Sequence, residues 1–269
     1  MTLDYIKCFK PVDVKALFRH LLIQAEASGI RGVHLTDEAA PPASLKQLAA
    51  LNREAGLPLV FWGNIRFEKA FTGKTAALLA AGGFIGFSGG IEVAAQEAFT
   101  RIGKGISLKD IVNTCAAFKE AGLLVHAYLI YGYWDSSAEE IITSAEIVRQ
   151  LFEAGLLDSA FWHQFSLTIH SRLYNEKLQG LHPALYPQPY STAPGKIKKL
   201  IKLPVFAFNN ISFKGEEHFE KYGPPLDNLL SRWMQGDTKG PVTKAFPFKV
   251  PKPAIKANLI AEMLEIIDN

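Results

Sequence analysis

The chain has 269 residues, of which 48% are apolar and 20% charged, enough to bury the core of a large globular domain. Its net charge of +3 is too small to indicate a nucleic-acid-binding protein. No stretch approaches the ~20 apolar residues that a membrane-spanning helix needs. The N-terminus "MTLDYIKCFKP" also has no signal-peptide core, so we expect no membrane partner and a cytoplasmic location.

Strand-like and helix-like patterns alternate through the first two thirds of the chain. A helical pattern begins near Val14, with Asp13 as its N-cap and Gly29 as its stop. A capping box of Ser136 and Glu139 is expected to begin a later helix. Strand patterns flanked by helical ones are "GVHLT" from Gly32, "PLVFW" from Pro58, "GFIGFS" from Gly83, "LLVHAYLIYG" from Leu123 and "SAFWHQF" from Ser159. This alternation predicts an α/β fold with a parallel sheet, either open or curled into a barrel.

The pattern changes after about Ser171 into Pro- and Gly-rich sequence with short helical pieces, "LDNLLSRWM" and "AIKANLIAEMLEIID". We therefore expect a main domain over residues 1–171 and an irregular or helical extension over 172–269 that packs on it. The two cysteines, Cys8 and Cys115, provide no disulfide framework, and Cys115 falls at the spacing of a helix core position.

Polar residues alternate with apolar ones along four of the expected strands. Successive strand residues point to opposite faces of a sheet, so these polar residues are expected on one face, near the carboxyl ends of the strands. Parallel α/β folds bind their ligands at those ends. The residues expected to converge there are His34, Trp62, Arg66, Ser88, Glu92, His126, Tyr128 and His163. Arg66 belongs to this set only if the second strand stays extended, and it otherwise pairs with a surface acid such as Glu68.

These residues alone leave more than one function open. Asp37, His126, His163 and His170 are of the types that bind zinc or manganese, as in a barrel hydrolase, although no tight ligand pair is present. A second possible function is that of a non-catalytic barrel that binds a small molecule or a partner.

Several stretches occur together in an order that resembles the radical S-adenosylmethionine (radical SAM) superfamily, especially members that often carry an upstream cobalamin-binding domain. They are "HLTDEAAPP", "FWGNIRFE", "LLAAGGFIGFSGGIE", "KGIS", "AGLLVHAYLIYGYW" and "FWHQFSLTIHS". The resemblance implies a partial TIM-like (β/α)6 barrel that binds S-adenosylmethionine across the strand ends. It also implies a [4Fe-4S] cluster that cleaves this cofactor reductively to a 5′-deoxyadenosyl radical.

The resemblance also implies roles for particular residues. The stretch "SGGIE", with Ser88, Gly89, Gly90 and Glu92, corresponds to a strand end that contacts the cofactor's ribose, where the glycines would let the backbone come close. Glu38 in "TDEA" corresponds to the turn that meets the methionine amino group. The "IYGYW" turn, with Ile130 and Gly132, corresponds to the adenine side, and Trp134 stands where the family has proline. Arg66 and Tyr128 complete the expected cofactor residues, and the expected substrate residues are Trp62, His126, His163 and His170.

One hallmark of the family is absent from these 269 residues. Members bind three irons of the cluster through a Cys-x3-Cys-x2-Cys loop after the first barrel strand, because thiolates suit iron–sulfur clusters. The segment "TLDYIKCFKP" corresponds to sequence that follows this loop, and Cys8 alone cannot replace three thiolates. We therefore expect a barrel that lacks its first strand. A late start, a split gene or degeneration would each produce such a chain, and we expect the isolated chain to be inactive. A separately encoded N-terminal half is one possible partner besides the small-molecule substrate, and cobalamin would require an upstream domain.

Overall fold

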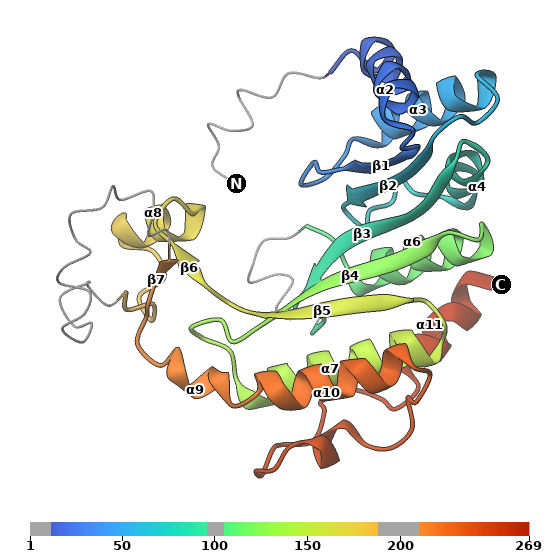
Figure 1. Cartoon of the computed structure of the whole chain (residues 1–269). Coiled ribbons are helices and arrows are strands. Elements are labelled where there is room, and N and C mark those ends of the chain that lie inside the picture. The colour runs from blue at the N-terminus through green and yellow to red at the C-terminus, as the bar shows by residue number, and fades with distance from the viewer. Residues whose placement is uncertain (1–11, 96–104, 188–209, 269) are drawn as a thin grey trace.

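A computed structural model describes residues 12–95, 105–187 and 210–268. Five parallel strands form one sheet in the order β1-β2-β3-β4-β5. They are β1 (Gly32–Leu35), β2 (Val60–Ile65), β3 (Phe84–Glu92), β4 (Leu124–Tyr131) and β5 (Ser159–Gln164). Helices alternate with them: α2 (Val14–Ser28), α3 (Pro42–Glu54), α4 (Gly73–Ala81), α6 (Leu108–Glu120) and α7 (Ala138–Glu153). The expected α/β fold is confirmed, and the curved sheet carries these helices along its outer side (Figure 1).

Local signals set several helix ends as expected. The carboxylate of Asp13 accepts hydrogen bonds from the backbone N–H groups of Lys15 and Ala16, and Gly29 ends α2 with φ of 73°. The expected capping box at Ser136 and Glu139 is wrong by one residue. Ser137 is the N-cap of α7 and accepts from the N–H of Glu140. Ser136 instead donates from its hydroxyl to the Glu140 carboxylate, because the chain still lies outside the helix there.

The core lies between the sheet and these helices, and phenylalanine rings fill much of it. Phe87 stacks on Phe84 with ring centroids 5.1 Å apart and on Phe118 at 5.0 Å. Cys115 is fully buried in this core, as expected, and burial raises the pKa of its thiol. This thiol therefore packs as an apolar group.

A buried amide connects three elements of the core. Asn52, at 0% exposure in α3, donates from Nδ2 to the carbonyl oxygens of Leu59 and Gly82, each at 2.8 Å. Its Oδ1 accepts from the N–H of Leu59 at 3.1 Å. These bonds satisfy backbone groups at the amino ends of β2 and β3, where no ladder partner reaches them.

The C-terminal part has two regions, one packed on the outside of α6, α7 and β5 and the other lying beyond the carboxyl end of β5 (Figure 1). It contains β6 (Leu167–Thr168), α8 (Arg172–Leu178), β7 (Asn210–Ile211), α9 (Glu217–Glu220), α10 (Gly223–Met234), the 3₁₀ helix η4 (Val242–Ala245) and α11 (Leu259–Asp268). Helix α10 contacts β5 and α7, and α11 contacts α6 and α7 (Figure 1). Gln150 of α7 donates to the carbonyl of Lys256 and accepts from the N–H of Ile260, which joins α7 to the start of α11.

Strand β1 is an edge strand whose only strand partner in the described ranges is β2. Beside it, α2 and α3 enclose a small pocket of about 110 Å³ lined by apolar side chains, among them Leu35 and Leu45, and by Asp37. Within the described ranges no helix is long and apolar enough to cross a lipid bilayer.

Candidate functional site on the open face of the sheet

The two faces of the sheet differ in what covers them. On β4, Val125, Ala127 and Leu129 are fully buried against the helix layer, whereas His126 and Tyr128 between them are only half-buried. Alternation therefore places His126 and Tyr128 on the opposite face, called here the open face. The register extends this face to β5, because Tyr128 lies beside Phe161 and Ile130 beside His163.

Trp62 and Ser88 join two strands on the open face. The Trp62 indole Nε1 donates a hydrogen bond of 2.8 Å to the hydroxyl oxygen of Ser88. The indole crosses β3 above Gly86, where an added Cβ would lie 2.5 Å from Trp62 Cζ3. Beside Ser88 in the register is Asn64, whose buried Oδ1 has no hydrogen-bond partner in the described part of the chain.

His126 lies on β4 in the open face and contacts two neighbours, Ser159 and Tyr128. Its Nδ1 is 2.8 Å from the hydroxyl oxygen of Ser159, and its ring meets that of Tyr128 edge-on at 5.0 Å. Burial lowers the pKa of His126, because desolvation disfavours the imidazolium. The ring is therefore neutral near pH 7, with one nitrogen donating and the other accepting.

The amino ends of the same strands are apolar and exposed on this face. Val60, Ile85, Leu124 and Phe161 are 40% to 52% exposed. Strict alternation in "GFIGFS" predicts that Ile85 lies with Phe87 on the helix side, opposite Gly86 and Ser88, and for Ile85 this is wrong. The β2–β3 register shifts after Phe61, so Ile85 is an extra residue that turns outward while Phe84 and Phe87 fill the core.

The carboxyl ends of β2 and β3 carry Arg66 and Glu92. β2 ends at Ile65, so Arg66 has left the strand and is exposed, with Nη2 close to Gly105 ahead of α6. Half-buried Glu92 ends β3 with φ of 60°, beside a register shift against β4. A non-glycine residue in this region costs roughly 1 to 3 kcal/mol, so the surrounding structure holds Glu92 there against strain. Both residues lie at the same end of the sheet, as expected.

Two of the predicted glycines serve packing. An added Cβ at Gly89 would lie 2.5 Å from the ring of buried Phe67, so this glycine faces the helix layer and makes room for that ring. Gly132 follows β4 with φ of 79° and lies against Phe219. Gly90 lies on β3 beside Tyr128.

An aromatic cluster above the carboxyl ends was missed by the strand pattern. Tyr133 stacks on Phe165 with centroids 4.5 Å apart, and Trp134 contacts both rings. The signal was present in "YGYW" and "HQFS", but these residues follow the strands, where alternation gives no direction.

Solved structures with a similar fold identify the architecture. The radical S-adenosylmethionine methyltransferase TsrM from Kitasatospora setae, with cobalamin and a [4Fe-4S] cluster bound, matches with a TM-score of 0.52 and 18% identity over 68% of this chain. The same enzyme with tryptophan and a SAM analogue gives a TM-score of 0.51 and 17% identity over the same share. This chain has the fold of a radical SAM barrel. It spans about a third of TsrM, 35% and 36% of those two chains.

The other comparisons are weaker. The radical SAM enzyme HemN, coproporphyrinogen III oxidase from Escherichia coli, matches with a TM-score of 0.46 and 17% identity over 57% of this chain and 37% of its own. No protein-family model and no curated protein matches the sequence.

The remaining predicted residues of the radical SAM pattern fall at scattered places. Glu38 is exposed in the loop after β1, and His170 is exposed in the turn after β6. Ile130 is half-buried on the open face and packs against the aromatic cluster. His163 is exposed there, with its ring 4.5 Å from that of Phe161.

Metal binding was one of the functions that the sequence left open. Across residues 12–95, 105–187 and 210–268, no group of three or more His, Cys, Asp or Glu side chains could hold a metal ion. The suggested hydrolase ligands Asp37, His126, His163 and His170 therefore do not form such a group. Cys8 lies outside the described residues, and Cys115 lies behind the sheet in α6.

Proposed function

We propose that the open face binds S-adenosylmethionine at the carboxyl ends of β3 and β4, with Ser88 and Glu92 on the ribose hydroxyls. The observation that carries the proposal is the strained backbone of Glu92 at this strand end, further along β3 than buried Ser88. Strain of this kind persists where a site needs a side chain aimed in a fixed direction.

The chemistry of the donor set fits the cofactor's nucleoside. Ser88 accepts from Trp62, so its own O–H remains able to donate, and the buried Asn64 Oδ1 is an acceptor. A carboxylate such as Glu92 accepts from the two hydroxyls of a ribose. When bound, S-adenosylmethionine supplies an activated sulfonium. The residues of this chain bind and orient it, while His126, Tyr128 and His163 face the substrate beside it.

The [4Fe-4S] cluster does not fit the residues of this chain. Its two cysteines are fewer than the three thiolates required, and the thiol of Cys115 is enclosed in the core. We therefore derive no step through a cluster. We propose that these 269 residues alone are inactive in reductive cleavage, with cobalamin, where used, bound by another domain.

The open edge of β1 supports a partner that contributes a further β-strand. Its backbone has no strand partner on the side away from β2 in the described ranges, and such an edge pairs readily with another strand. We propose that a strand bearing the cluster thiolates, upstream in the full protein or separately encoded, pairs there in the cytoplasm.

Isothermal titration with S-adenosylmethionine tests the binding proposal. We expect measurable binding, weakened about tenfold in Glu92→Gln, because a neutral amide accepts more weakly than a carboxylate. Glu54→Gln, at the exposed end of α3, is the matched control and should bind like the wild type. Absence of binding, or equal loss in both variants, would overturn the proposal.

Anaerobic iron–sulfur reconstitution tests the inactivity of the isolated chain. We expect sub-stoichiometric iron and no 5′-deoxyadenosine under dithionite. Near-stoichiometric iron and sulfide, with product, would show that the chain supplies its own ligands. If the chain binds the cofactor but no reaction occurs even when an upstream half is added, the second candidate, a non-catalytic small-molecule barrel, would be favoured.

A further inference from the structure

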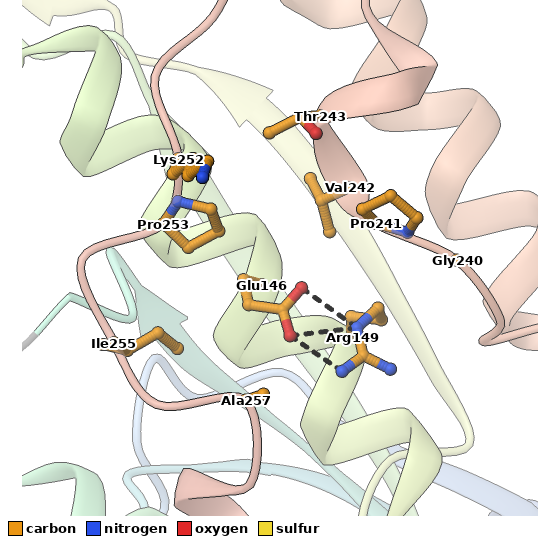
Figure 2. Close-up of a pocket in the computed structure, with 10 residues that line it drawn as sticks. All are labelled: Glu146, Arg149, Gly240, Pro241, Val242, Thr243, Lys252, Pro253, Ile255 and Ala257. Atoms are coloured by element: carbon orange, nitrogen blue, oxygen red, sulfur yellow. Dashed lines mark hydrogen bonds and ion pairs between the residues drawn. The ribbon is translucent and has the colours of Figure 1, made fainter.

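A pocket on the outer side of the molecule lies where the segment after α10 packs against α7 (Figure 2). Its volume is about 620 Å³, within the range of small-molecule sites. Helix α7 covers the side of the sheet away from the open face, so this pocket is separate from the site proposed above.

The floor of the pocket is a fixed ion pair on α7. Arg149 donates to both carboxylate oxygens of Glu146, with Nη2 to Oε1 at 2.7 Å and Nε to Oε2 at 3.0 Å. Its Nη1 donates to the carbonyl of Thr238 at 3.1 Å and lies 3.0 Å from Glu153 Oε2. Glu146 and Arg149 are each only 11% exposed, and hydrogen bonding to Glu146 raises the pKa of Arg149. The guanidinium is thus held by the protein between the carboxylates of Glu146 and Glu153 and is not free to bind a ligand.

The walls are apolar and stiff. Pro241 and Val242 stand on one side, and Pro253 and Ile255 stand on the other (Figure 2). The second wall is anchored to α7, because the N–H of Ala254 donates to Thr143 Oγ1 at 2.9 Å. Two prolines and an anchored segment lose little freedom when a ligand binds, which favours a rigid apolar body between the walls.

The rim of the pocket carries one lysine, Lys252. Residues 239–256 contain five lysines and no Asp or Glu. Lys252 lies across the pocket from Thr243 in Figure 2, and it is exposed, with no ion pair to any residue that the structure describes. An unpaired ammonium and a hydroxyl above apolar walls suit an anionic head group.

We propose that this pocket binds a small amphipathic anion, an aromatic or aliphatic carboxylate or sulfonate. Its apolar body lies between Val242 and Pro253, above the Glu146–Arg149 pair, and its charge lies between Lys252 and Thr243.

Fluorescence titration with 8-anilinonaphthalene-1-sulfonate tests the proposal on the full chain. We expect one saturable site whose dissociation constant rises about tenfold in Lys252→Glu, because reversal turns attraction into repulsion. Lys46→Glu makes the same change of net charge on exposed α3 and should stay within about twofold of the wild type. Ala257→Trp, which places a large ring at the pocket, should weaken binding at unchanged net charge.

Two further controls locate the probe. Phe161→Ser removes an exposed ring from the open face and should leave the affinity unchanged. The uncharged N-phenyl-1-naphthylamine should bind more weakly than the sulfonate, and thermal unfolding by circular dichroism should show each variant folded. Equal effects of Lys252→Glu and Lys46→Glu, loss of binding in Phe161→Ser, unchanged binding in Ala257→Trp, or equal binding of the uncharged probe would overturn the proposal.

Discussion

Trp62 and Ser88 are joined by a hydrogen bond of 2.8 Å from the indole N–H to the serine hydroxyl, across neighbouring strands on the face of the sheet that the helices leave uncovered. The indole crosses Gly86 to reach Ser88. Ser88 is 3% exposed, so the pair fixes a polar group in a position that water hardly reaches.

The strength of this pair can be measured by a double-mutant cycle. We expect Trp62→Phe and Ser88→Ala each to lower the free energy of unfolding by about 1 kcal/mol, because each leaves one polar group unpaired. The double variant should show a coupling energy of about 1 kcal/mol in urea titrations. Strict additivity would contradict the hydrogen bond.

Gly89→Ala tests whether this glycine serves packing. The added methyl carbon would lie 2.5 Å from the Phe67 ring, so we expect the free energy of unfolding to fall by about 1 to 3 kcal/mol. Gly32→Ala, where nothing lies within 4 Å, is the matched control and should change stability by less than about 0.5 kcal/mol. Phe67→Leu should recover part of the loss in the double variant, and its failure to do so would contradict the assignment.

Asn52→Ala should be among the most destabilising single substitutions in α3. It removes three hydrogen bonds and leaves the carbonyls of Leu59 and Gly82 without this donor, so we expect a loss of about 2 to 4 kcal/mol in urea unfolding. Arg53→Ala, the exposed neighbour on the same helix, should change stability by less than about 0.5 kcal/mol. Similar losses in both variants would contradict the role given to Asn52.

His126 should make stability depend on pH. Its pKa in the folded protein lies below its ordinary value of 6.5, so the unfolded chain binds more protons between these two values. The contribution of His126 is therefore fully present above about pH 6.5 and is lost as pH falls through the lowered pKa. Comparing urea unfolding of the wild type and His126→Gln across this range isolates the effect, and parallel pH profiles would contradict it.

Local periodicity already determined much of the fold from the sequence. Alternating apolar and polar residues in "LLVHAYLIYG" assigned His126 and Tyr128 to one face and Val125 and Ala127 to the other, because successive strand residues must point to opposite sides. The ends of α2 were equally readable, since a capping carboxylate at Asp13 and a left-handed glycine at Gly29 act within a few residues.

Tertiary packing decided what periodicity could not. Ile85 faces outward because β3 accommodates an extra residue against β2, and Gly89 faces Phe67 from a different segment, so neither outcome is encoded within one strand. Arg66 lies outside the sheet because β2 stops one residue before it. The pocket at Glu146 depends on contacts with residues such as Val242, about a hundred positions away along the chain, and only folding brings them together.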